Sequence, residues 1–338
     1  MHLALTQMLA VGTGNKMVAA GAMYTVVLRN DGTVWAMGYN QAGQLGVGSK
    51  LAHIGTPVPM AAAMGSGNTA IAAGFSHTVI LRGDGSVWSV GDNNAGQLGC
   101  GKQTRGYTRT PAPMADVMGT ANTAVAAGYD FTLVLRADGA VWGVGWNEFG
   151  QLGDGSRAES KNTDNFSPVT MLVGIGNVMI SAGYQHSAVL RSDGSVWTTG
   201  NNDRGQLGIF NATGRRTPGP MDGVGTGNTA VATGYEHTLV IRGDGSVWTS
   251  GSSGAGQLGE GAGGIRVDPP LATTVSGMAP KSGWFGWSCT ALSPISGSYT
   301  ISCNRRTLTA RVTVYFGPQE DTGELAVPTY EYRSDDRP

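Results

Sequence analysis

The sequence predicts an all-β fold, a β-propeller of four-stranded antiparallel blades. Two observations carry this prediction. Asp-Gly pairs recur at intervals of 51 to 55 residues, and a tryptophan follows each of these aspartates by four residues. No apolar pattern with the 3.6-residue period of a helix persists anywhere in the chain. A unit of about 50 residues with several short strands, repeated along the chain, is typical of one propeller blade.

The composition excludes several classes of protein. The net charge is -1 and only 13% of the residues are charged, so the basic excess needed for general nucleic-acid binding is missing. A hydrophobic content of 40% disfavours disorder. No apolar run approaches 18 residues and no basic segment opens the chain, so we expect neither a membrane span nor a signal peptide.

The Asp-Gly pair of each unit predicts a hairpin. In the second unit a run rich in β-branched residues, 72–81, leads into Asp84-Gly85, and a second such run follows at 86–90. We expect the recurring aspartates to shape the turns and the recurring tryptophans to pack between blades. These structural residues are Asp31, Asp84, Asp138, Asp193 and Asp244, with Trp35, Trp88, Trp142, Trp197 and Trp248.

A Gly-Gln-Leu-Gly sequence and a proline-containing strand complete each unit. The leucine of Gly-Gln-Leu-Gly follows the tryptophan by ten residues in every copy, and its glycines predict a sharp backbone corner. A loop of variable length comes next. The stretch 56–60 then predicts an edge strand, because proline is tolerated at a sheet edge and not in a central strand.

The repeat resembles that of the regulator of chromosome condensation family. The resemblance spans about residues 11–270 in five copies. In the second copy it rests on Ala73-Gly74, His77-Thr78, Asp84-Gly85, Trp88 and Gly96-Gln97-Leu98-Gly99. The resemblance implies a propeller, typically of seven blades. It also implies one of several activities: nucleotide exchange on a small GTPase, chromatin association, or inhibition of another protein by the propeller rim.

The repeats occupy residues 1–303, and we expect them to form a ring of about six blades. The approximate copies are 11–55, 56–109, 110–166, 167–216, 217–268 and a degenerate 269–303. In the last copy Ser296-Gly297 stands where Asp-Gly is due, and Ile301 replaces the tryptophan. Seven blades, some of them irregular, and an incomplete ring that oligomerises are the alternatives.

The tail, residues 304–338, differs from the repeats because 11 of its 35 residues are charged. Its stretch 308–316 alternates like a half-buried strand, so we expect the tail to be partly β and to help close the ring. Three cysteines are too few for a disulfide framework. Whether Cys289 and Cys303 pair stays open.

The repeat provides an internal control for catalytic and metal-binding motifs. His77, His186 and His237 occupy one repeat position, which suggests a metal cluster, but Tyr24 and Phe131 occupy the same position in other copies. A position that accepts tyrosine and phenylalanine is a packing position. No paired carboxylates, Ser-His-Asp set or Cys-x-x-Cys stands out, so we expect no enzymatic activity, no metal and no cofactor.

Partner-binding residues are expected where the copies differ. The position four residues after each tryptophan varies and is expected to be exposed, and the loops after Gly-Gln-Leu-Gly diverge. Aromatic residues and arginine dominate the energetics of protein interfaces. The predicted binding residues are Tyr39, Arg105, Tyr107, Arg109, Trp146, Phe149, Phe166, Phe210, Arg215 and Arg216.

The sequence thus favours a non-catalytic propeller scaffold that binds a protein partner through one loop face. The alternative is a structural or adhesive recognition protein that is part of a virion, displayed on a cell surface or secreted. Such a protein would bind glycans or cells. An exchange factor for a small GTPase is disfavoured, because linkers of about 9 to 14 residues leave no room for an inserted β-wedge. The partner, the oligomeric state and the compartment, cytoplasmic or virion and extracellular, stay open.

Overall fold

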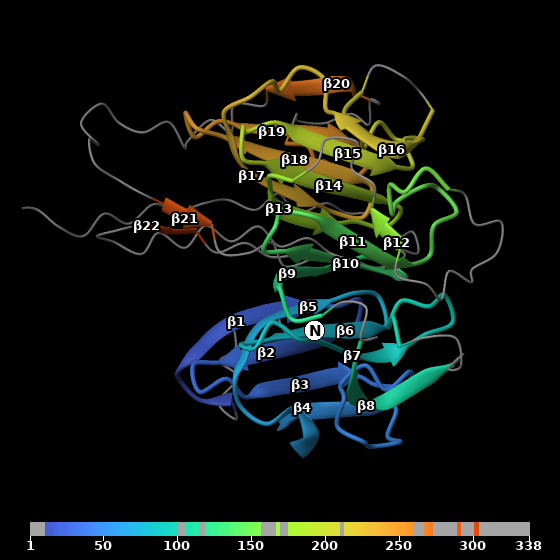
Figure 1. Cartoon of the computed structure of the whole chain (residues 1–338), viewed down its shortest axis with the longest axis vertical. Helices are drawn as coiled ribbons and strands as arrows, with labels where there is room; N and C mark the ends of the chain where they lie inside the picture. Colours follow the sequence, from blue (N-terminus) through green and yellow to red (C-terminus); the bar gives the residue numbers. More distant parts are fainter. Residues whose placement is uncertain are drawn as a thin grey trace, which may run out of the picture.

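The fold is all-β apart from one short 3-10 helix, Ala62–Met64, within the described part of the chain. A computed structural model describes residues 11–100, 106–114, 119–156, 167–169, 175–209, 213–259, 267–272, 289–291 and 301–303. Five four-stranded antiparallel sheets follow one another in chain order, each with its strands in sequence order (Figure 1). Each sheet is one propeller blade, which confirms the predicted fold class.

The strands have similar lengths in all five blades. The first blade holds β1 (Asn15–Ala20), β2 (Tyr24–Arg29), β3 (Val34–Tyr39) and β4 (His53–Pro59). The second holds β5 (Asn68–Ala73), β6 (His77–Arg82), β7 (Val87–Asp92) and β8 (Tyr107–Pro113). The third holds β9 (Asn122–Ala127), β10 (Phe131–Arg136), β11 (Val141–Gly145) and β12 (Ser167–Val169). The fourth holds β13 (Asn177–Ala182), β14 (His186–Arg191), β15 (Val196–Gly200) and β16 (Arg215–Pro220). The fifth holds β17 (Asn228–Thr233), β18 (His237–Arg242), β19 (Val247–Gly251) and β20 (Val267–Ala272).

The Asp-Gly pairs form the hairpin turns between the second and third strands. In the first blade Oδ1 of Asp31 accepts hydrogen bonds from the backbone N–H of Thr33 at 2.9 Å and from its hydroxyl at 2.7 Å. Gly32 has a φ of 78°, which glycine adopts without the steric cost that a side chain brings. An arginine before the turn stacks on the tryptophan after it. The arginine Cζ lies 5.4 to 5.8 Å from the ring centroid in all five blades.

The proline-containing strands lie at the outer edge of the sheets, as the sequence predicts. In the first blade β4 pairs with β3 alone, so its prolines remove no hydrogen bond from a second neighbour. The repeat boundary drawn between residues 55 and 56 runs through β4, whereas the structure assigns the whole strand to the first sheet. The corner before the edge strand is anchored by Leu45, whose backbone N–H donates to Oδ1 of Asn40 at 3.1 Å.

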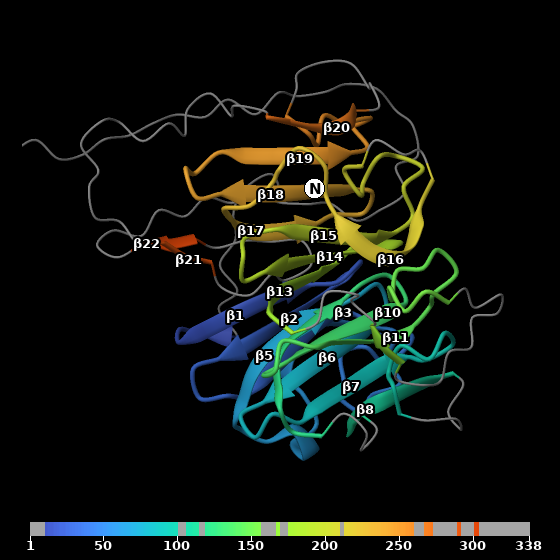
Figure 2. The same cartoon turned by 45° about the horizontal axis from the view of Figure 1, so that its top comes forward.

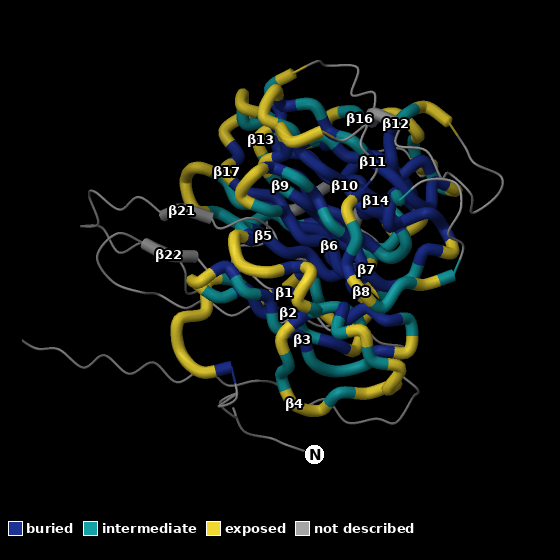
Figure 3. Tube along the Cα trace, turned by 60° about the horizontal axis from the view of Figure 1, so that its bottom comes forward, coloured by how far each residue is buried: buried dark blue, intermediate teal, exposed yellow. Residues whose placement is uncertain are grey.

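The hydrophobic core lies between consecutive blades. Val26 and Leu28 of the first blade are buried against Ile71 and Ile80 of the second, and Trp88 packs against the same cluster. Equivalent clusters join the second blade to the third, the third to the fourth and the fourth to the fifth. Figure 2 shows the resulting stack of sheets. In Figure 3, buried residues lie mostly along the strands and exposed residues mostly in the connecting loops.

The first strands of consecutive blades contact one another and form one side of the stack. The degenerate sixth repeat contributes a two-stranded sheet, β21 (Cys289–Ala291) and β22 (Ile301–Cys303), in which Cys289 and Cys303 are register partners. Five complete blades and this partial one agree with a propeller of about six blades. The predicted tail, 304–338, lies outside the described residues, as does the closure expected of it.

Candidate functional site

The position that holds His77 is part of the interface between blades. His77 is fully buried, and its Nε2 lies 3.1 Å from the hydroxyl oxygen of Thr132 in the next blade. Thr132 donates its own hydroxyl proton to the backbone carbonyl of Gln97, at 2.8 Å. Because the Thr132 oxygen acts as a donor to Gln97, it is available to accept the proton of His77. One threonine therefore ties a histidine and a Gly-Gln-Leu-Gly corner together across the interface.

The same connection recurs with different residues. Tyr24 has its hydroxyl 3.3 Å from the hydroxyl oxygen of Thr78, which donates to the carbonyl of Gln44 at 2.7 Å. His186 lies 3.0 Å from the hydroxyl of Thr238, which donates to the carbonyl of Gln206. Burial lowers the pKa of His77 to about 4 and that of His186 to about 3, so both rings are neutral near neutral pH. No group of three His, Cys, Asp or Glu residues in the described ranges is placed to hold a metal ion.

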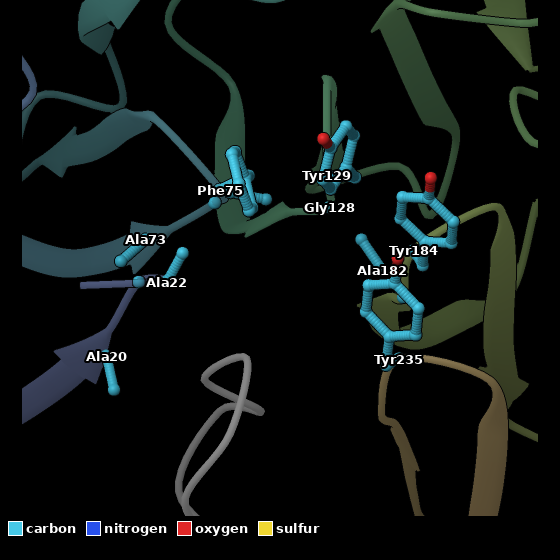
Figure 4. Close-up of a pocket in the computed structure, with 13 residues that line it drawn as sticks. Ala20, Ala22, Ala73, Phe75, Gly128, Tyr129, Ala182, Tyr184 and Tyr235 are labelled. Atoms are coloured by element: carbon cyan, nitrogen blue, oxygen red, sulfur yellow. The ribbon is translucent and has the colours of Figure 1, made fainter. Parts of the chain in front are cut away.

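Two residues earlier in each repeat, the chain presents a different surface. Phe75, Tyr129, Tyr184 and Tyr235 stand at equivalent positions in the second to fifth blades, and we call these four residues the aromatic rim (Figure 4). Ring centroids of neighbours are 4.3 Å apart for Phe75 and Tyr129, 4.5 Å for Tyr129 and Tyr184, and 4.1 Å for Tyr184 and Tyr235. The rings therefore form one continuous aromatic surface across four blades.

Backbone hydrogen bonds between blades hold the aromatic rim in line. The N–H of Phe75 lies 3.3 Å from the carbonyl oxygens of Gly128 and Tyr129 in the next blade. The N–H of Tyr129 donates to the carbonyl of Gly183, and that of Tyr184 donates to the carbonyl of Tyr235, both at 3.2 Å. The glycine before each aromatic residue permits this approach. A Cβ on Gly128, for example, would lie only 2.7 Å from the carbonyl oxygen of Gly183.

The aromatic rim borders a pocket whose lining is apolar. The other lining residues are alanines and glycines from the ends of the first strands: Ala20, Gly21, Ala22, Ala73, Gly74, Ala127, Gly128, Ala182 and Gly183. The pocket is asymmetric, because Ala22 of the first blade stands where the other four blades have an aromatic ring. Phe75 and Tyr235 are 38% and 39% exposed, although backbone hydrogen bonds to the neighbouring blade fix the position of each residue.

Carboxylates surround the aromatic rim. Burial raises the pKa of Tyr129, and the charges of Asp130 and Asp92 raise it further. Burial likewise raises the pKa of Tyr235, with added contributions from its hydrogen bond to Tyr184 and from the charge of Glu236. Burial is the main cause of both shifts, and the nearby carboxylates add to it.

Two further charged residues lie at this edge. Glu148 accepts a hydrogen bond from Nε1 of Trp146 at 3.2 Å. The cation Arg204 is 62% exposed and pairs with Glu236 at 3.7 Å. Among the described residues at this edge, several carboxylates and the cation Arg204 therefore accompany the aromatic rim.

Two of the predicted binding residues lie at this site, behind its surface. Trp146 is 7% exposed, which corrects the expectation that the position four residues after the tryptophan is exposed. Its ring lies 6.2 Å from those of Tyr129 and Tyr184 and 5.5 Å from that of Phe149. Trp146 and Phe149 thus support the aromatic rim from within. The backbone N–H of Trp146 donates to the carbonyl of Asp130 at 2.8 Å, which places Trp146 next to the blade's own rim residue, Tyr129.

Other predicted residues lie elsewhere. Tyr39 packs on His53 with 5.2 Å between ring centroids. Tyr107 is 54% exposed on the edge strand β8, and the guanidinium of Arg109 lies 4.5 Å from its ring centroid. These two contacts lie on the third and fourth strands of their blades, and their residues do not line the pocket. Arg105, Phe166 and Phe210 lie outside the described residues.

The two remaining candidates, Arg215 and Arg216, lie on the edge strand β16. Arg215 turns back onto its own sheet, where it donates to the carbonyl of Thr198 at 2.9 Å and to its hydroxyl at 2.8 Å. Burial lowers the pKa of Arg215 to about 10, against the opposing charge of Asp222. Its role in this arrangement is to bind strands together. Arg216 is exposed, and its carbonyl accepts from the N–H of Gly155 at 3.0 Å.

The four residues of the aromatic rim were not among the sequence-predicted binding residues. The available signal was an aromatic residue directly after a small-residue pair in four successive repeats. Recurrence of this kind indicates a structural role in the rest of the repeat. Here it marks an exposed surface, because each blade presents the position at the same edge.

A family model described as the RCC1-like domain matches residues 4–310. The chain is 31% identical over 205 residues to the ultraviolet-B receptor UVR8 of Arabidopsis thaliana, which is 60% of this chain and 45% of the receptor. It is 31% identical over 223 residues to the human probable E3 ubiquitin-protein ligase HERC6, which is 66% of this chain and 22% of that protein. The chain therefore spans less than half the length of these two relatives.

Solved structures show the same fold. Human WBSCR16 superposes with a TM-score of 0.74 at 21% identity, covering 87% of this chain and 75% of that one. Yeast RCC1 (Prp20), in a complex with Kap60, superposes with a TM-score of 0.57 at 20% identity, covering 78% and 76%. No helix within the described residues is long and apolar enough to cross a membrane.

Proposed function

This chain belongs to the RCC1-like domain family, and we propose that it is a non-catalytic scaffold whose aromatic rim binds a protein partner. The observation that carries the proposal is the row of partly exposed rings on rigid backbone positions, next to an apolar pocket. Exposed aromatic residues in a fixed arrangement are the usual anchors of protein interfaces, because they lose little side-chain entropy on binding.

The relatives support a role in protein binding. A structure of yeast RCC1 is described as bound to Kap60, and another structural study of the same yeast protein concerns binding to Gsp1p and histones. Those partners belong to the yeast protein. For this chain they indicate that a propeller of this fold can present a surface to other proteins, while the residues that select the partner differ between members.

Affinity capture with a matched pair of variants tests the proposal. One variant replaces two residues of the aromatic rim, Tyr129→Ser and Tyr184→Ser. The control replaces two exposed apolar residues at the other end of the blade that carries Tyr184, Ile175→Ser and Val178→Ser, which are 73% and 52% exposed. We expect the control to capture the same proteins from a source lysate as the unmodified chain, and the rim variant to lose them.

Both variants are first compared by circular dichroism and thermal unfolding, so that only folded proteins enter the capture. Equal capture by the rim variant and the control would contradict the proposed binding surface. Capture of glycans or cells in place of proteins, lost in the rim variant, would keep the surface and favour the adhesive alternative.

A further inference from the structure

The aromatic rim stops at the first blade. At this repeat position Ala22 replaces the ring that the next four blades carry. The backbone connection changes at the same place. Phe75, Tyr129 and Tyr184 each donate an N–H across to the following blade, whereas no such bond from Ala22 is present among the described backbone groups. The pocket is lined by Ala20, Gly21 and Ala22 on this side and by the aromatic rim on the other.

Phe75 is the end of the row on the side of the pocket. Its neighbour on one side is Tyr129, at 4.3 Å between centroids, and no ring contact on its other side is made by the described residues. The side chain is 38% exposed. A flat group from another molecule would therefore continue the row by stacking on Phe75, above Ala22. The interior rings, Tyr129 and Tyr184, each have a neighbouring ring on both sides. At the other end of the row, Tyr235 is already stacked face to face on Tyr184 at 11°.

A described carboxylate lies beside this end of the rim. The backbone N–H of Asp92 donates to the carbonyl of Ser76, the residue after Phe75, at 2.9 Å, which places Asp92 beside the end of the row. The charge of Asp92 also contributes to the raised pKa of Tyr129, which is caused mainly by burial. Arg204, which pairs with Glu236, lies in the fourth blade, and Glu236 lies in the fifth. This ion pair is therefore at the opposite end of the aromatic rim from Phe75.

We propose that the space above Ala22 binds an arginine side chain of a partner protein, with its guanidinium stacked on Phe75 and its charge near Asp92. The proposal rests on the proposed function, and it names the chemistry of the partner. A guanidinium is planar, stacks on aromatic faces and pairs with carboxylates through two parallel hydrogen bonds. A lysine ammonium lacks the plane, and a neutral aromatic group lacks the charge.

The test uses a short labelled peptide, acetyl-Gly-Arg-Gly-Arg-Gly-amide, and two analogues in which both arginines are lysine or citrulline. Citrulline keeps the planar group and removes the charge. Binding to the full chain is followed by fluorescence anisotropy at low and high salt. We expect the arginine peptide to bind about tenfold more tightly than either analogue, with an affinity that falls as salt is added.

Two variants locate the site. Ala22→Tyr supplies the ring that other blades carry at this position, so it fills the space with a residue the fold already accommodates. It is expected to weaken arginine-peptide binding at least tenfold. Asp92→Asn is expected to weaken it about fivefold and to reduce the salt dependence. The matched controls are Val178→Tyr and Asp138→Asn, at the far ends of β13 and β10, and both are expected to bind as the unmodified chain does.

Equal binding of the arginine and citrulline peptides, or full binding by a folded Ala22→Tyr protein, would overturn the proposal. These outcomes differ from failure of the proposed function. If capture of proteins still depends on Tyr129 and Tyr184 while arginine shows no preference, the surface stands and the arginine assignment fails. If capture does not depend on the aromatic rim, both fail.

Discussion

Two positions at the start of the second strand of each blade, only two residues apart, have opposite surroundings. His77 is fully buried and bonds to the next blade, whereas Phe75 is 38% exposed at the edge of a pocket. Both positions recur in all five repeats, and both sit on rigid backbone. The buried position accepts tyrosine, histidine or phenylalanine because each fills the same space. The exposed position keeps its rings in four blades without any need to fill a core.

This comparison separates two reasons for recurrence in a repeat protein. A repeated residue at a blade interface contributes to stability at every interface, so its replacement is expected to affect unfolding. A repeated residue at an exposed edge contributes a row of identical groups to one surface, so its replacement is expected to affect binding. The following predictions concern stability and run from the largest expected effect, at the buried blade interfaces, to the smallest, at the exposed edge.

The largest effect is expected from pH, through the three buried histidines. Their pKa values are lowered from the ordinary 6.5 to about 4 for His77, about 3 for His186 and about 4 for His237, in each case mainly by burial. The unfolded chain binds protons below pH 6.5 and the folded protein does not, so stability is complete above pH 6.5 and is lost as pH falls toward 4. Each histidine adds up to about 1.4 kcal/mol per pH unit to this slope.

Urea denaturation at a series of pH values between 7 and 5 measures that slope. In the variant His77→Phe the slope is expected to fall by about one third, because the third blade already carries phenylalanine at this position. A free energy of unfolding that stays constant over this range would contradict the role assigned to the buried histidines.

The next largest effect is expected at Gly145, at the end of β11. Its φ is 108°, and a Cβ there would lie 2.8 Å from the Cα of Phe131 and 3.1 Å from that of Gln97. The variant Gly145→Ala is expected to lose about 3 kcal/mol of unfolding free energy. Gly106 has nearly the same φ, 113°, but no atom of the described residues lies within 4 Å of the added Cβ, so Gly106→Ala is expected to lose only about 1 kcal/mol. Equal losses would show that the close approach of neighbouring backbone to Gly145 is unimportant.

A smaller effect is expected from the hydroxyl that joins the second and third blades. Thr132→Val removes the bonds to His77 and Gln97 while keeping the volume, and is expected to cost about 2 kcal/mol. Adding His77→Phe removes the unpaired nitrogen that the first change leaves. The double variant is therefore expected to be more stable than the sum of the two single effects, as a double-mutant cycle would measure. Strict additivity would argue against a direct interaction.

The smallest effect is expected at the exposed ion pair of Arg204 and Glu236, 3.7 Å apart. Arg204→Ala is expected to change the free energy of unfolding by less than about 0.5 kcal/mol, because water and salt screen such a pair. Thermal unfolding at low salt provides the measurement. A loss of more than about 1 kcal/mol would mean that this edge, like the blade interface, contributes substantially to stability.

Much of the fold was predictable from the sequence because its signals are local. The Asp-Gly pair at Asp84-Gly85 directs its own turn, and the prolines of β4 identify an edge strand without reference to other blades. The exposure of a residue between blades is not a local property. It depends on how far one sheet is rotated against the next, which no short pattern in a single repeat encodes.

The candidate site was predictable only in part for the same reason. Trp146 and Phe149 were predicted as binding residues and lie at the site. Trp146, however, is buried behind the rings of Tyr129 and Tyr184 and packs against them. Arg215 was predicted as a contact residue, but its long side chain folds back onto Thr198 of its own sheet. The aromatic rim itself becomes visible only when four blades are placed side by side.

Photo-crosslinking tests the central claim, that the aromatic rim is the binding surface, most directly. A photoreactive phenylalanine analogue is placed at Tyr184 in one protein and at Val178, at the other end of β13, in another. We predict that the residue 184 protein forms crosslinks to partner proteins from the source lysate and that excess arginine peptide suppresses them, while the residue 178 protein forms none. Crosslinks from residue 178 alone would place the binding surface at the opposite end of the blades and contradict the account.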